Sequence, residues 1–97
     1  MAPKARLAEL GIQLPDAPAS VANYVPCIQT GNLVMTAGQL PFVAGQVVLP
    51  GKVGGELTSE QGAEAAKIAV INGLAQIDAL VGDLSRVVRV LRVEGFV

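Results

Sequence analysis

The stretch Thr58–Gly82, TSEQGAEAAKIAVINGLAQIDALVG, carries the clearest structural signal in the chain. Thr58 is followed three residues later by Gln61, which is the spacing of a capping box at the start of a helix. Apolar side chains then recur three and four residues apart, as they do on one face of a helix. Gly82 is a residue type that ends helices. The stretch therefore predicts a helix over about Ser59–Val81.

A β-hairpin is predicted before this helix. Residues Tyr24–Thr30 have the composition of a strand, Gly31-Asn32 is a two-residue turn signal, and Leu33–Ala37 is the returning strand. Gly38 ends or bulges that strand. The chain then leaves the sheet at Pro41, because proline cannot donate a hydrogen bond to a central ladder.

The other segments complete an α+β arrangement. Residues 1–20 are predicted to hold a short helix over Pro3–Leu10 and an extended lead-in. Gly45–Leu49 is predicted as a third short strand, a glycine-rich loop follows it, and the valine-rich Arg86–Val97 is predicted as the last strand. The expected order is β-β-β-α-β, with the long helix as a right-handed crossover on one face of a mixed sheet. The 97 residues are expected to form a single domain.

Composition favours association between copies of the chain. Hydrophobic residues make up 52% of the sequence and charged residues only 15%, against about 25% charged in typical soluble domains. The excess of apolar side chains predicts a subunit contact, and a monomer with an apolar surface is the alternative. A net charge of −1 gives no general attraction to nucleic acid or acidic membranes. Without a signal-peptide-like or membrane-spanning run, we expect a cytoplasmic protein.

Few side chains suit acid–base or nucleophilic chemistry. The chain has no histidine and one cysteine, which excludes Cys/His zinc sites, and no metal or cofactor is expected. Cys27 lies in an apolar strand without a visible base, and we interpret it as a small core residue. Most acidic residues lie on or beside the long helix and are interpreted as its solvated face.

Two groups of residues could still bind a ligand. The predicted last strand carries three arginines that alternate between its faces, Arg86, Arg89 and Arg92. They could be solvated or salt-bridged, or they could bind a carboxylate. Tyr24 begins the first predicted strand of the hairpin, and the strand that ends at Gly38 could present backbone N–H groups to an anionic or carbonyl oxygen. The alternative for this second group is an ordinary strand end with a packed tyrosine.

At these residues the sequence resembles the RidA/YjgF family. The resemblance runs from about Val21 to Val97 and includes Tyr24, the turn Gly31-Asn32-Leu33 and the motif Ala37-Gly38-Gln39-Leu40-Pro41. The segment of residues 5–11 is similar to a divergent subgroup of that family. The resemblance implies a chorismate-mutase-like α+β fold, a homotrimer, and clefts between subunits for a small carboxylate or imino acid. Well-studied members hydrolyse reactive 2-imino acids to 2-keto acids and ammonia without a cofactor or a metal.

Carried over to this sequence, the resemblance implies Tyr24, Ala37, Gly38 and Gln39 as substrate-binding residues and assigns no catalytic residue. Ala37 stands where the family often has serine, so that hydroxyl is lost, and Thr36 faces the opposite side of the strand.

A second departure concerns the end of the family domain. Family members continue past the position of Val97 with a second helix and two strands, which carry an arginine that binds the substrate carboxylate and a late acidic residue. We therefore expect this domain to be incomplete at its C-terminal end, and Arg89 and Arg92 are not assigned to the arginine's role.

Three functions remain open from the sequence. The first is a RidA-like deaminase, a hydrolase of 2-imino and enamine acids. The second is a non-catalytic trimeric module that binds a small carboxylate. The third is endoribonuclease or translation-inhibitor activity, as some relatives are labelled, although the sequence has no histidine and no one-sided basic stripe.

Overall fold

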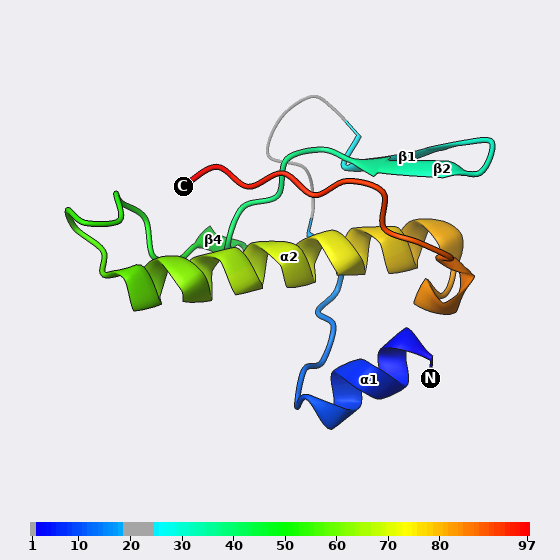
Figure 1. Ribbon diagram of the computed structural model, residues 1–97, viewed down its shortest axis with the longest axis horizontal. Helices are drawn as coiled ribbons and strands as arrows, with labels where there is room; N and C mark the ends of the chain where they lie inside the picture. The colour runs from blue at the N-terminus through cyan, green and yellow to red at the C-terminus, as the bar shows by residue number, and fades with distance from the viewer. Residues whose placement is uncertain (1, 19–24) are drawn as a thin grey trace.

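A 23-residue helix, α2 (Ser59–Val81), is the element around which the other segments are arranged (Figure 1). The computed structural model describes residues 2–18 and 25–97. The predicted capping box is confirmed, with Gln61 N donating to Thr58 Oγ1 over 3.2 Å and Thr58 N donating to Gln61 Oε1 over 2.9 Å. At the other end Gly82 has a φ of 92°, a left-handed conformation that glycine adopts without a steric cost. The sequence thus predicted both ends of α2 correctly.

The predicted hairpin is present but shorter. Strand β1 (Cys27–Thr30) pairs antiparallel with β2 (Leu33–Thr36), so that Cys27 lies opposite Thr36. Both strands contact α2. Alternation divides the hairpin into two faces: Cys27 and Val34 on one face are half-buried, whereas Ile28 and Met35 on the other are 52% exposed. The predicted start of the first strand, Tyr24, lies outside the described residues.

A second, smaller hairpin was predicted only in part. Strand β4 (Gln46–Val47) lies within the predicted strand 45–49, but its partner β3 (Phe42–Val43) was not foreseen. The turn between them has positive φ at Ala44 (51°) and Gly45 (81°), as in the type I′ turns that join two-residue hairpins. Among the described residues, the strands form two separate two-stranded antiparallel sheets rather than one mixed sheet.

The predicted last strand, Arg86–Val97, was wrong for this structure. Residues Leu84–Arg86 form a short 3-10 helix, η1, and the rest of the segment pairs with no described strand. In Figure 1 it runs back along α2 in the opposite direction. Val88 is 95% and Phe96 92% exposed. Valine favours extended backbone, but a strand also needs a neighbour for its N–H and C=O groups.

The N-terminal helix α1 (Pro3–Glu9) agrees with the prediction to within a residue. It contacts η1, and its Lys4 pairs with Asp78 of α2. The core of the described chain is small. Its buried apolar side chains are Leu57, Ala75, Val81 and Leu84. Two amide side chains on α2, Asn72 and Gln76, are buried with them. None of the described helices is long and apolar enough to cross a membrane.

Candidate functional site

The candidate site is the segment Ala37–Pro41, called the AGQLP segment below, which joins β2 to β3 without regular secondary structure. Its first residue extends the hairpin by one bond, since the Ala37 N–H donates to Pro26 O over 2.8 Å. Gln39 then folds back locally, and its Nε2 donates to Ala37 O over 3.0 Å. The start of the segment is therefore fixed to the hairpin.

Helix α2 fixes the other end. The buried amide of Asn72 donates from Nδ2 to Leu40 O and to Phe42 O, both at 3.0 Å. Leu40 O also accepts from Phe42 N over 2.8 Å, and Pro41 O accepts from Val48 N over 2.9 Å. The carbonyl groups of this part of the chain are thus satisfied from within the protein.

Three backbone N–H groups of the same segment, in contrast, have no hydrogen-bond acceptor in the described chain. No residue that the structure describes accepts a hydrogen bond from the backbone N–H of Gly38, Gln39 or Leu40. Gly38 is exposed, and a Cβ placed there would meet no atom within 4 Å. Consecutive N–H groups without acceptors form a partly positive patch that can bind a carboxylate or an oxyanion. Open N–H donors are what the hypothesis of a ligand site at Gly38 requires, and binding of a ligand there stays a prediction.

Three of the four predicted site residues are neighbours in the sequence and lie in the AGQLP segment. Ala37, Gly38 and Gln39 are consecutive, and Tyr24 lies outside the described residues. The side chain of Gln39 is half-buried, with its amide engaged by Ala37 and its Cγ 3.5 Å from where a Cβ at Gly73 would stand. The segment therefore offers a ligand its backbone rather than the Gln39 side chain.

Sequence reasoning missed Asn72, the residue that connects this segment to the core. The signal was present: an asparagine followed by Gly73 within a run of apolar helix residues. A polar side chain on a buried helix face needs hydrogen-bond partners there, and the missing information was which carbonyl groups would supply them.

The described residues offer no activated thiol and no metal-binding cluster. Burial raises the pKa of the Cys27 thiol above its ordinary value, which keeps the thiol protonated and argues against a nucleophilic role. Among residues 2–18 and 25–97, no three potential ligands cluster to hold a metal ion.

The three arginines divide between structural and free roles. Arg86 Nη1 donates to Val81 O over 2.7 Å at the end of α2, and Arg92 pairs with Glu94 at 2.7 Å. In the described part of the chain, Arg89 alone of the three has neither an ion pair nor a side-chain hydrogen bond.

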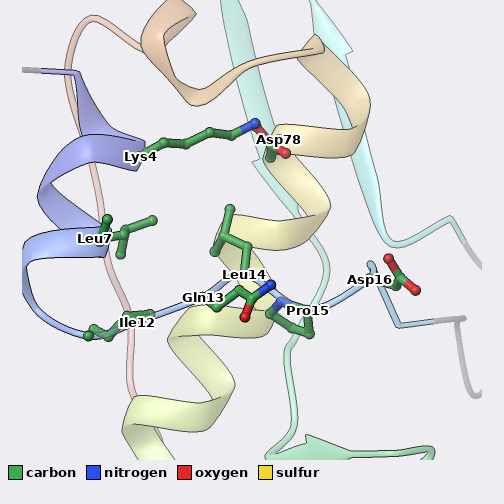
Figure 2. A pocket seen from close by; sticks show the side chains of 10 residues that line it. Lys4, Leu7, Ile12, Gln13, Leu14, Pro15, Asp16 and Asp78 are labelled. Carbon is green, nitrogen blue, oxygen red and sulfur yellow. The ribbon is translucent and has the colours of Figure 1, made fainter.

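A surface groove lies between α1 and α2 (Figure 2). It is an open groove of about 600 Å³, and Leu7, Ile12 and Leu14 lie between the two helices there. At one end Lys4 Nζ lies 3.1 Å from Asp78 Oδ1, and this hydrogen bond to Asp78 raises the pKa of Lys4. The same Oδ1 accepts from Leu84 N over 3.1 Å. Because Asp78 connects α1, α2 and η1, we interpret the groove as the place where these three elements pack together.

The fold and the AGQLP segment define a YjgF-type domain, and comparison with known proteins gives the same answer. The family model described as "YjgF/chorismate mutase-like, putative endoribonuclease" matches residues 4–97. The chain belongs to this family, so the resemblance and the fold predicted from the sequence are both confirmed.

Individual relatives support the assignment. The chain is similar to protein TCP17 of Trypanosoma cruzi, with 38% identity over 93 residues that cover 96% of this chain and 58% of TCP17. A solved structure from Shewanella oneidensis MR-1, titled a "putative endoribonuclease", has a TM-score of 0.83 and 35% identity, covering 89% of this chain and 57% of that one. Protein Atu1372 of Agrobacterium tumefaciens, of unknown function, has a TM-score of 0.70 and 43% identity, covering 84% and 49%. The chain thus spans between about half and three-fifths of the length of these relatives.

Proposed function

We propose that the protein is a RidA-like hydrolase that converts reactive 2-imino or enamine acids to 2-keto acids and ammonia. The observation that supports this proposal best is the set of open N–H groups at Gly38, Gln39 and Leu40, on a segment whose Leu40 and Pro41 carbonyl groups are bound within the protein. A 2-imino acid carries a carboxylate, and the amino alcohol formed by adding water develops negative charge on its oxygen as it loses a proton and expels ammonia. Both features suit a patch of backbone donors.

The reaction balances without a cofactor. Water adds to the imine carbon to form a tetrahedral amino alcohol, and loss of ammonia from it leaves the 2-keto acid. In the proposed site the N–H groups hold the carboxylate or the developing oxyanion and thereby orient the imine carbon toward water. Tyr24 would line the same cleft, as the family resemblance implies. The proposal names no described residue as the general acid or base. It applies equally to a longer protein that contains this chain.

A non-catalytic module for small carboxylates is the second candidate. It is favoured by the lack of reactive side chains on the AGQLP segment: Ala37 has no hydroxyl, and the amide of Gln39 is already engaged. Such a module would use the same N–H groups to bind its ligand but would not accelerate hydration.

RNA cleavage is the third candidate, because the matching family model and the Shewanella protein carry that label. The side chains give it less support. The chain has no histidine, Arg86 donates to Val81 O, and Arg92 forms an exposed pair with Glu94.

We also propose that the protein works as a homotrimer with the ligand at subunit clefts. The outer face of the β1–β2 hairpin supports association, because it exposes the apolar side chains of Ile28, Leu33 and Met35. Native mass spectrometry should give three times the 9.9 kDa chain mass. A species of one chain mass at micromolar concentration would contradict the trimer.

Two matched glycine variants test the site. Neither Gly38 nor Gly95 has a left-handed φ or an atom within 4 Å of an added Cβ, so both should accept alanine without loss of folding. Gly38→Ala should lower kcat/KM for the loss of freshly generated 2-iminobutanoate by about 10-fold, since its methyl group would stand where the ligand approaches. Gly95→Ala should leave the rate unchanged.

The outcomes separate the candidates. Saturable binding of 2-oxobutanoate with no acceleration of imine loss would favour the binding module. Equal rates for both glycine variants would remove Gly38 from the site, and unchanged kinetics in Tyr24→Phe would remove Tyr24.

A further inference from the structure

Asn72 is the most buried polar side chain in the described chain, at 2% exposure, and it lies near the middle of α2. An asparagine amide has two hydrogens to donate. Here its nitrogen serves two acceptors, Leu40 O and Phe42 O, each at 3.0 Å. These carbonyls flank Pro41, which has no N–H of its own. One buried side chain therefore fixes the backbone on both sides of the proline.

The next residue of the helix supports the same contact. Gly73 is buried, and a Cβ in its place would lie 3.5 Å from Gln39 Cγ, within ordinary van der Waals contact. The glycine thus leaves room for Gln39 against α2, and Asn72 is the residue that binds this part of the chain to the helix. The N–H groups of residues 38–40, which have no acceptor among the described residues, come directly before the Leu40 carbonyl along the chain. Their direction depends on the backbone that the helix holds.

We propose that Asn72 is the positioning residue of the ligand site: by binding Leu40 O and Phe42 O it sets the backbone that presents the Gly38, Gln39 and Leu40 N–H groups to a carboxylate or oxyanion. The inference rests on the proposed function for the identity of the ligand. Asn72 itself does not touch the substrate, because its amide hydrogens are directed at the two carbonyl groups.

Gln76 provides a matched control one helical turn further along. It is also a buried amide on α2, at 6% exposure, and it also donates to a backbone carbonyl, that of Pro18. That carbonyl belongs to the N-terminal segment rather than to the AGQLP segment. Loss of either amide should destabilise the fold, whereas only loss of Asn72 should disturb the site.

The kinetic test compares Asn72→Ala, Asn72→Ser and Gln76→Ala at equal folded fraction, with 2-iminobutanoate as substrate. Asn72→Ala should lower kcat/KM by about 10- to 100-fold more than Gln76→Ala, because small displacements of positioned groups have effects of this size. Asn72→Ser should fall between, since a hydroxyl donates one hydrogen in place of two. A rise in KM would show that the N–H groups hold the carboxylate, and a fall in kcat that they hold the oxyanion.

A second measurement does not depend on activity. The N–H groups of Phe42 and Val48 donate to Leu40 O and Pro41 O, so amide exchange followed by NMR reports on the segment. Asn72→Ala or Asn72→Ser should speed exchange at these two amides and leave the Ala37 amide of the hairpin unchanged. Equal loss of activity in the Asn72 and Gln76 variants, with unchanged exchange at Phe42 and Val48, would overturn the positioning role.

Failure of the proposed function would be distinguishable. If the unaltered chain does not consume 2-iminobutanoate, the hydrolase proposal fails, and a titration with 2-oxobutanoate still decides on Asn72. Amide signals of residues 38–40 that shift in the unaltered chain but not in Asn72→Ala would support the inference. Shifts in both proteins, or in neither, would overturn it.

Discussion

The AGQLP segment and the segment Val87–Val97 both lack regular secondary structure, yet they differ in the hydrogen bonds that hold their backbone. In the first, Asn72 of α2 binds the Leu40 carbonyl and the Val48 N–H binds the Pro41 carbonyl. The second pairs with no described strand, and its apolar side chains are exposed. Irregular backbone is well defined when a core element supplies its hydrogen bonds. Strand propensity alone, as in the valine-rich tail, does not replace a partner.

The largest effect on stability should come from Leu84 of η1, which lies just before the segment Val87–Val97. Leu84 is 3% exposed, and its N–H donates to Asp78 Oδ1 over 3.1 Å. Leu84→Ala should lower the free energy of unfolding by about 2–5 kcal/mol, because it opens a cavity in a small core. Urea denaturation followed by circular dichroism measures this change. A loss below about 0.5 kcal/mol, the range of surface substitutions, would mean that η1 is not part of the core.

This comparison also shows what the sequence could predict. Both ends of α2 follow from local signals, Thr58 with Gln61 at one end and Gly82 at the other, and local signals need no tertiary partner. The turn at Gly31-Asn32 was predicted for the same reason. The hypothesis that the Gly38 N–H is open to a ligand also came from a local signal, the glycine just after the second strand, and it stays a prediction.

The missed features all depend on contacts between distant segments. The two acceptors of Asn72 are 30 and 32 residues away in the sequence, and no local pattern identifies them. Strand β3 is two residues long and follows Pro41, so its pairing with β4 depends on a turn that places a non-glycine residue, Ala44, at positive φ. The predicted strand 86–97 failed for the complementary reason, since its propensity is local but its pairing is not.

Two glycines in α2 should separate close packing from helix propensity. A Cβ at Gly62 would lie 2.6 Å from Val53 Cγ2, whereas one at Gly73 would meet only Gln39 Cγ at 3.5 Å. Alanine at either position gains up to about 1 kcal/mol of helix propensity. The clash should make Gly62→Ala less stable than Gly73→Ala by about 1–3 kcal/mol. Thermal and urea unfolding of both variants test this difference.

Equal stabilities would show that the loop carrying Val53 moves freely, and would place that loop with the poorly supported segments. A less stable Gly73→Ala would instead mean that Gln39 cannot adjust, which would tighten the link between α2 and the AGQLP segment.

A smaller effect is expected from pH, at the loop that precedes α2. The Lys52 N–H donates to Glu56 Oε2 over 2.8 Å, and this bond lowers the pKa of Glu56 below its ordinary value of 4.5. A group with a lowered folded pKa stabilises the fold above its unfolded pKa, and that contribution is lost as the pH falls through the folded pKa. Stability should therefore decline below about pH 4.5.

Urea midpoints between pH 3 and 7 for the unaltered chain and for Glu56→Gln measure this contribution. The glutamine variant should lose part of the acid-induced decline, because its amide oxygen accepts the same hydrogen bond at every pH. Superimposable pH profiles for the two proteins would show that the bond adds nothing to stability. It would then resemble the exposed Arg92–Glu94 pair of the tail, for which a contribution near zero is the expectation.

The smallest effect on folding should come from the tail itself. Val88 is 95% exposed, so Val88→Asp should change the free energy of unfolding by less than about 0.5 kcal/mol in a dilute, monomeric sample. Leu84→Ala, four residues earlier, is the matched comparison, since both substitutions remove apolar side chains from the same stretch of chain.

The informative measurement for Val88→Asp is then the oligomeric state. If another subunit covers the tail, Val88→Asp should weaken association while leaving unfolding of the separated chain unchanged, because a carboxylate would be buried without a partner. A destabilisation close to that of Leu84→Ala in a monomeric sample would instead show that Val88 packs within its own chain.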